Sequence, residues 1–248
     1  MKTALIIFTW LILFCNSVQV QAETKKEWGG SFSMMYQQRY IAIKTSKNVY
    51  DFPMLWGNLN LNHQSSGLFT NFWWSESFRG SFDSERGNEF EPTIGWKKPL
   101  DKFYAELSAT LYNIHFNNWD SNPWILTTKF GKEINPSLKC ELWAEWMSPI
   151  SHFRDGATVL TINLPYIYKE PFGFERLALL FNNLIVWDDG FGADDPHGIF
   201  LRQYYGAEYK ALSDLALFGG ITPLWKLTKT TDGRKNEHTY SFGVKYSF

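Results

Sequence analysis

The chain has 248 residues, a formal net charge of −1 and an aromatic content of 18%, with 12 Trp, 12 Tyr and 21 Phe. This near-neutral balance argues against a nucleic-acid partner. The mean hydropathy is −0.29, and no apolar run approaches the roughly twenty residues of a membrane-spanning helix. Abundant aromatic residues without such a run are typical of transmembrane β-barrels, in which lipid-facing and lumen-facing residues alternate and average out.

The first residues have the features of an export signal. Met1 and Lys2 give a positive start, Ala4 to Phe14 is apolar, and Val20-Gln21-Ala22 is a signal-peptidase cleavage pattern. We therefore expect residues 1–22 to be a cleaved secretory signal peptide and residues 23–248 to form one domain. Only Cys140 would then remain, which excludes an intramolecular disulfide and suits a small apolar position facing lipid.

The last twelve residues, EHTYSFGVKYSF, alternate without a break. Tyr240, Phe242, Tyr246 and Phe248 lie on one face, and small or polar residues lie on the other. This pattern is typical of the closing strand of an outer-membrane β-barrel, whose terminal aromatic residue resembles the signature read by the barrel-assembly machinery. We expect that machinery, outer-membrane lipids and lipopolysaccharide to be partners of the chain.

Similar alternation recurs along the chain from Trp28 onward. We expect twelve strands, at residues 28–43, 54–63, 68–78, 89–98, 102–112, 124–132, 138–147, 157–169, 175–187, 198–211, 214–227 and 237–248. The eleventh contains Pro223, which cannot donate to a ladder and indicates a bulge or a strand end. The intervening connections alternate between short and long, as periplasmic turns and external loops do. The expected fold is all-β, a closed antiparallel transmembrane β-barrel with both termini in the periplasm.

Several segments near the start carry a family resemblance. They are Tyr36-Gln37-Gln38-Arg39-Tyr40, Pro53-Met54-Leu55-Trp56-Gly57, Leu61-Asn62-His63-Gln64-Ser65-Ser66-Gly67-Leu68-Phe69 and Trp73-Trp74-Ser75-Glu76-Ser77. Their order resembles the opening of the TorF-like outer-membrane porins, in which an Arg-containing strand, a His-Ser-Gly turn and a Trp-x-Ser motif follow one another. The resemblance covers about a third of the mature chain. It implies an outer-membrane barrel and a pore, and names no solute.

Eight charged residues fall on the polar phase of their strands: Arg39, Glu106, Glu141, Glu145, Arg202, Glu208, Lys210 and Lys245. An Arg or Lys facing lipid at mid-height costs about 2–4 kcal/mol, so we expect these residues to line the lumen. If they pair across the barrel, they form a plug. If they segregate, they form the selectivity zone of a pore.

A second chemistry is suggested by His63-Gln64-Ser65-Ser66-Gly67. This segment locally resembles the His-x-Ser-Asn-Gly motif of outer-membrane phospholipase A, with His63 as base and Ser65 as nucleophile. Ser77 stands where that family has the Asn that orients the His, and Gln, Ser and Gly are also ordinary turn residues. The hydrolase therefore stays an alternative.

No metal site or cofactor is expected. Residues Asp188 to Asp195 form an acidic loop, but its spacing matches no calcium loop. The five histidines are scattered. The sequence thus predicts a non-enzymatic porin of the outer membrane that passes small hydrophilic solutes. The alternatives are a non-conducting structural or surface-interaction barrel and, more remotely, the lipid hydrolase.

Overall fold

The computed structural model describes residues 27–41, 48–50, 52–78, 89–112, 123–148, 156–189, 198–228 and 236–248. The predicted signal peptide lies outside them. Twelve strands form one closed antiparallel barrel, in the order β1-β14-β13-β12-β11-β10-β9-β8-β7-β6-β5-β4. Their bounds are β1 (Trp28–Gln37), β4 (Met54–His63), β5 (Leu68–Ser77), β6 (Glu89–Leu100), β7 (Phe103–Leu111), β8 (Trp124–Asn135), β9 (Leu138–Met147), β10 (Ala157–Lys169), β11 (Leu177–Asp188), β12 (Gly198–Lys210), β13 (Leu215–Lys226) and β14 (Glu237–Ser247). The predicted closed twelve-stranded barrel is confirmed.

The barrel closes where the first strand meets the last. The β1 and β14 strands pair from Ser31 opposite Ser247 to Gln37 opposite Ser241. Beyond this ladder, the amide of Gly30 donates to the carbonyl of Phe248 at 3.0 Å, and the amide of Phe248 donates back at 3.1 Å. A Cβ at Gly30 would lie 2.4 Å from a backbone oxygen of β4 and 2.9 Å from the Phe248 ring. A glycine is therefore needed at the seam.

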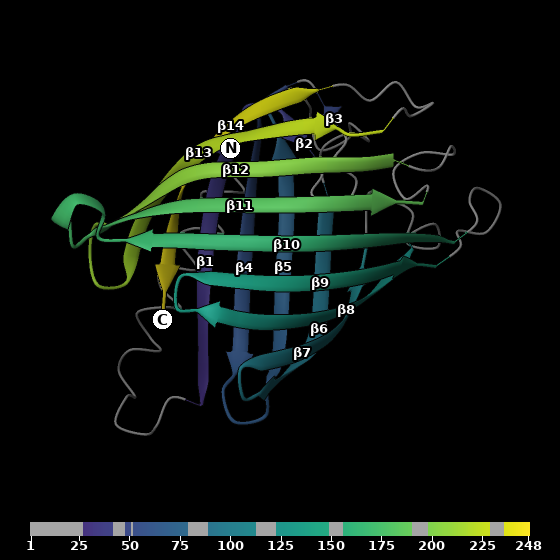
Figure 1. The fold of residues 1–248 in the computed structure, drawn as a ribbon, viewed down its shortest axis with the longest axis horizontal. Coiled ribbons are helices and arrows are strands. Elements are labelled where there is room, and N and C mark those ends of the chain that lie inside the picture. The colour runs from purple at the N-terminus through teal and green to yellow at the C-terminus, as the bar shows by residue number, and fades with distance from the viewer. Residues whose placement is uncertain are drawn as a thin grey trace.

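The two ends of the barrel differ in their connections. We call the end with the short connections, residues 64–67, 101–102, 136–137, 170–176 and 211–214, the turn end, and the opposite end the loop end. The turn-end connection after β10 contains a single 3-10 turn, η2 (Pro171–Gly173). Figure 1 shows β9 to β12 crossing the near side while β1, β4 and β5 run steeply behind them, as expected of strongly tilted strands in a closed sheet. No helix in the described ranges is long and apolar enough to cross a membrane.

Two predicted strand limits need correction. The first predicted strand, residues 28–43, is divided: β1 ends at Gln37, opposite the first residue of β4, and a separate hairpin follows, made of β2 (Tyr40–Ile41) and β3 (Asn48–Tyr50). Beyond Gln37 there is no β4 residue to pair with, so the ladder on that side ends, although the Gln38 amide still donates to the Tyr240 carbonyl of β14 at 2.9 Å. The sixth strand is longer than predicted, because β8 keeps pairing with β9 until Asn135 reaches Leu138.

Pro223 does not end a strand or form a bulge, contrary to the prediction. It lies within β13 opposite His238 of β14, and the β13–β14 register is continuous from Leu215 to Leu224. On the other side of β13, the pairing with β12 skips from Leu224 to Ile221. Proline lacks only the N–H, so the ladder on one side is interrupted while the other side holds the strand in place.

The outer wall is apolar and banded. Aliphatic side chains that are exposed in the isolated chain face outward at mid-height, among them Ile94, Leu107, Leu126, Leu142, Leu160 and Ile162. Exposed aromatic residues flank this band, with Trp28, Trp96, Phe103, Tyr168 and Tyr209 toward the turn end and Trp124, Trp146, Trp225 and Tyr240 toward the loop end. An apolar band between two aromatic girdles matches a lipid bilayer and its two interfaces.

Candidate functional site: the barrel lumen

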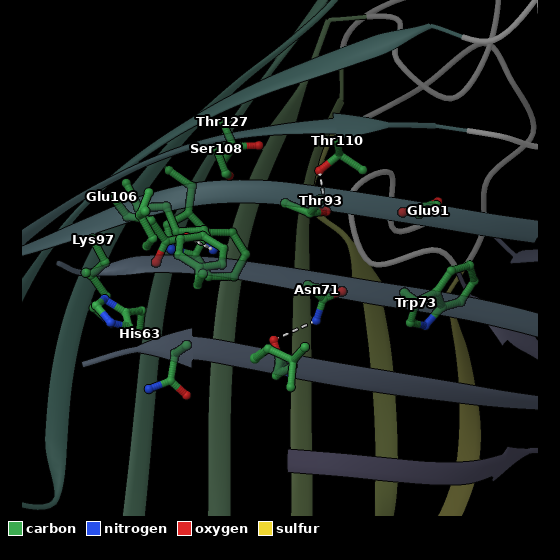
Figure 2. A pocket seen from close by; sticks show the side chains of 18 of the residues that line it. His63, Asn71, Trp73, Glu91, Thr93, Lys97, Glu106, Ser108, Thr110 and Thr127 are labelled. Carbon is green, nitrogen blue, oxygen red and sulfur yellow. Dashed lines mark hydrogen bonds and ion pairs between the residues drawn. The ribbon is translucent and has the colours of Figure 1, made fainter. Parts of the chain in front are cut away.

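The inner wall of the barrel is polar over most of its length. A cavity of about 850 Å³ is lined by Ser108 and Thr110 of β7, Thr93 of β6, Thr127 of β8 and Thr161 of β10. Since residues directly opposite in an antiparallel pair lie on one face, these side chains establish the inward phase of their strands. Figure 2 shows the cavity running along the strands from His63 and Lys97 at the turn end toward Trp73 and Glu91.

A cluster of amide side chains forms the β4 and β5 side of this cavity. The Asn71 amide donates to Asn58 Oδ1 at 2.6 Å and to Asn60 Oδ1 at 2.7 Å. Asn60 in turn donates to Asn58 at 3.3 Å. Leu59 and Leu61 alternate with these asparagines, and this period of two is what places all the amides inside.

An ion pair and two cation–π contacts lie on the β6 to β9 side. Lys129 Nζ is 2.9 Å from Glu106 Oε1, with 27% and 11% of the two side chains exposed. The same ammonium group lies 4.8 Å from the ring centroid of Trp143. Lys97 lies 3.9 Å from the ring centroid of Tyr104. Both lysines are thus stabilised by π faces, and Lys129 is stabilised by a carboxylate as well.

Glu141 is the centre of a hydrogen-bonded group in the lumen. It accepts hydrogen bonds from the Tyr104 hydroxyl, from Trp143 Nε1 at 3.0 Å and from the Asn163 amide at 2.7 Å. Its neighbour on the same face, Glu145, is buried and accepts from the Thr127 hydroxyl at 3.3 Å. Both carboxyl groups act as hydrogen-bond acceptors in these contacts, and both side chains lie on the inner wall.

The other predicted lumen residues lie on the opposite part of the ring. Arg202 and Glu208 of β12 share the phase of buried Phe200, and Lys245 of β14 lies opposite Ser33 and Ala216 on the inner face. Lys210 is exposed at the turn end of β12. Arg39 lies just beyond β1, where its amide donates to the buried Thr239 hydroxyl at 3.1 Å. Whether any of these residues lines a conducting path stays a prediction.

Sequence reasoning missed several charged residues of the inner wall. Glu89, Lys129 and Glu237 share the inward phase, and so do Lys139 and Lys226. Lys129 was missed because the segment 124–132 was given no phase. The alternation Ile125, Thr127, Lys129 against Trp124, Leu126, Thr128 was the signal that would have revealed it.

At the loop end the lumen is packed rather than open. Six apolar inward side chains from consecutive strands are at most 2% exposed: Ile125, Met147, Val159, Val186, Phe200 and Leu224. The remaining strands contribute buried side chains at a similar height, including Glu89, Met54, Gln37 and Thr239. We call the six apolar residues the loop-end ring. They indicate that the lumen narrows toward this end.

Large aromatic rings in the lumen lie against glycines. A Cβ at Gly131 would be 2.3 Å from the Tyr104 ring, and a Cβ at Gly206 would be 2.5 Å from the Tyr204 ring. Gly95 has the same relation to Phe69 at 2.3 Å. Each glycine lets a ring lie close over the wall on the inner face, which leaves the axis of the barrel less obstructed.

The segment proposed for lipid hydrolysis is a tight turn at the rim. His63 Nδ1 is 2.8 Å from Ser66 Oγ, not from Ser65, and Ser66 Oγ also accepts from the Leu68 amide at 3.1 Å. His63 Nε2 lies 3.5 Å from Glu27 Oε2, whose side chain is 72% exposed. Trp96 Nε1 donates to the Ser66 carbonyl at 2.8 Å. These contacts stabilise the turn, and Ser65 is not the serine that contacts His63.

No group of three or more potential metal ligands occurs in the described part of the chain. Asp188 is buried at the end of β11, while residues 190–197 of the predicted acidic loop lie outside the described residues. Cys140 is a free thiol on the outward phase, opposite Lys132 of β8.

No family model matches the sequence, and no curated protein matches it either. Solved structures do match. The KdgM porin aligns with a TM-score of 0.53 and 12% identity over 89% of this chain and 99% of that one. The NanC porin aligns with a TM-score of 0.56 and 9% identity over 88% of this chain and all of that one. At such identities the likeness concerns the backbone alone, so the chain has the fold of the small outer-membrane porins.

Proposed function

We propose that this chain is an outer-membrane porin through which small hydrophilic solutes diffuse without covalent chemistry. One observation carries the proposal: a closed barrel with an apolar, girdled outer wall encloses a polar cavity of about 850 Å³. Side chains that filled the barrel completely would leave no such space, so the cavity favours a path for water and small polar solutes. Lumen rings that lie against glycines also favour a path through the barrel.

The orientation follows from the connections. Short turns face the periplasm in barrels of this type, so the turn end, with both termini of the barrel domain, is periplasmic in our proposal. Phe248 would present the closing strand to the assembly machinery, and the loop end would meet lipopolysaccharide. The segments that resemble the TorF-like porins fall on β1, β4 and β5 and the turn between β4 and β5, which supports membership of that group.

The charge of the cavity narrows the choice of solute. A KdgM porin has been solved in complex with disordered oligogalacturonate. The cavity of this chain is lined by Glu91, Glu106 and Glu145 against Lys97 and Lys129. The cavity lining is mixed in sign rather than basic, so we do not extend that polyanionic ligand to this chain.

Planar-bilayer recording of the refolded barrel tests the proposal. We expect discrete conductance steps in KCl and swelling of proteoliposomes in isotonic solutions of small polar solutes. Refolded preparations without steps and without swelling would contradict it. A heat-unfolded sample of the same protein serves as the control for leakage.

The loop-end ring favours a second candidate, a barrel that does not conduct. Its six residues are almost wholly buried, and an apolar constriction stops water and ions by dewetting. The same recordings separate the two candidates, because a closed barrel would be silent while still resisting urea unfolding in lipid.

A further inference from the structure

The charged side chains of the inner wall are sorted by strand. On β6 to β9 the inward phase holds six carboxylates and three lysines, which we call the acidic wall: Glu89, Glu91, Glu106, Glu133, Glu141 and Glu145 with Lys97, Lys129 and Lys139. Five of these charged side chains make the contacts described above: Lys97, Glu106, Lys129, Glu141 and Glu145. The acidic wall therefore has a net negative charge.

The opposite balance occurs on β12, β13, β14 and the end of β1, which we call the basic wall. Five cations face inward or lie at the inner rim there, against two carboxylates: Arg39, Arg202, Lys210, Lys226 and Lys245 with Glu208 and Glu237. Strands β4 and β5 contribute no inward charge, and β10 and β11 contribute one of each sign, Lys169 and Asp188. The whole inner wall is thus close to neutral, although each of the two walls is not.

The order of strands in the ring places these walls face to face. In a closed ring of twelve strands, partners six places apart are diametrically opposed, which pairs β6 with β12, β7 with β13, β8 with β14 and β9 with β1. A strand spacing of about 4.8 Å and a tilt of about 40° give a backbone diameter of roughly 24 Å. Once side chains occupy part of that width, the remaining gap is comparable to the Debye length of about 8 Å.

We propose that the lumen selects zwitterionic solutes, small molecules that carry an ammonium and a carboxylate group, over neutral molecules of the same size. This inference rests on the proposed pore function and names its solute class. A dipolar solute lying across the lumen is attracted electrostatically at both ends, because its ammonium group points toward the acidic wall and its carboxylate toward the basic wall. A single ion is attracted by one wall and repelled by the other. Because the total charge of the inner wall is near zero, the lumen should show little preference between K⁺ and Cl⁻.

Two orphaned acceptors support an ammonium site between the walls. The Oδ1 atoms of Asn163 and Asn182 are buried on the inward phase of β10 and β11 and have no hydrogen-bond partner within the described structure. Asn163 is 4% exposed, and its amide donates to Glu141. Buried acceptors require a donor, and the N–H groups of an ammonium beside Glu141 supply one.

Proteoliposome swelling with an isomeric pair of solutes tests the proposal directly. Glycine and glycolamide have the same atoms and mass, but only glycine is zwitterionic. We expect glycine to enter at least about threefold faster than glycolamide. Equal rates through a conducting barrel would overturn this inference while leaving the pore intact. If neither solute enters and no conductance steps occur, the pore function and this inference both fail.

Variants of each wall test whether the preference for glycine comes from the electric field between the acidic wall and the basic wall. Glu91→Gln with Glu145→Gln should reduce the glycine advantage and shift the KCl reversal potential toward anions, and Arg202→Gln with Lys226→Gln should shift it toward cations. Lys132→Gln is the matched control, because that lysine lies on the outward phase 5.1 Å from the ring centroid of Phe103. Where a wall variant misfolds, the wild-type reversal potential decides: we expect a permeability ratio within about twofold of one. A strongly selective wild type would overturn the proposal.

Discussion

The turn-end and loop-end halves of the lumen are lined by different kinds of side chain. The turn-end half and the middle of the lumen surround a cavity with amides, hydroxyls, carboxylates and lysines, and many of these side chains bond one another. The loop-end half narrows to the loop-end ring, whose six apolar side chains are buried. The same strands pass through both halves, so the difference comes from which residue occupies each inward position.

This difference separates two tasks. Polar side chains that hold one another in place can give a solute a defined electrostatic environment, and the turn-end half has them. The loop-end ring instead provides close packing, which costs several kcal/mol to disturb. We therefore expect changes at the loop end to alter stability and conductance, and changes at the turn end to alter selectivity.

The largest effect is expected from Phe200→Ala. Phe200 is completely buried in the loop-end ring, and truncating a buried Phe costs about 3–5 kcal/mol. Urea unfolding in lipid vesicles should show that loss, and single-channel conductance should rise because the ring is wider. Phe242→Ala is the control, since Phe242 is 64% exposed on the outer wall. Unchanged conductance in Phe200→Ala would show that the ring does not limit the path.

Gly131→Ala should narrow the turn-end half instead. Its new Cβ would lie 2.3 Å from the Tyr104 ring, so the ring must swing toward the barrel axis, at a cost of about 1–3 kcal/mol. We expect smaller single-channel conductance.

Gly57→Ala offers a matched comparison for that change. Its Cβ would meet the Trp74 ring at 2.1 Å, but this pair lies on the outward phase opposite Met34. It should lose stability without losing conductance. If both variants conduct alike, the position of the Tyr104 ring does not matter for passage.

A smaller effect is expected from Glu106→Gln. The substitution removes the charge partner of Lys129 while keeping the shape of the side chain, and the partly exposed pair should be worth about 1 kcal/mol. A double-mutant cycle with Lys129→Met measures the coupling in unfolding experiments. The variant should also become more permeable to anions. Zero coupling energy would mean that solvent screens the pair completely.

The smallest effects concern the turn after β4. Ser66→Ala removes the contacts with His63 and the Leu68 amide and should cost about 1 kcal/mol. Ser65→Ala should cost less than about 0.5 kcal/mol. Neither variant should differ from the parent in a phospholipid-release assay. Release that depends on either serine would restore the hydrolase alternative.

Several elements could be predicted in detail from the chain. The bounds of β4, β9 and β10 agree with the predicted ranges, because each alternates cleanly between two turn or loop segments. The inward phase of Glu106, Glu141 and Glu145 also followed from their neighbours, since the side-chain period of a strand is a local property.

Other features could not be predicted in this way. At the loop end both phases are apolar, so Val159 and Val186 gave no sign of which face they occupy. The end of β1 at Gln37 depends on where β4 begins, and the continuation of β13 through Pro223 depends on its pairing with β14. Each of these outcomes is decided by a neighbouring strand rather than by the segment itself.

The sequence by itself determined that this chain forms a barrel with an apolar outer wall, because the alternation of apolar and polar residues with a period of two is a local property of each strand. Only the tertiary structure decided which charges confront one another. The acidic strands β6 to β9 and the basic strands β12 to β14 are far apart in the chain, and they become opposite walls only when β14 pairs with β1 and closes the ring.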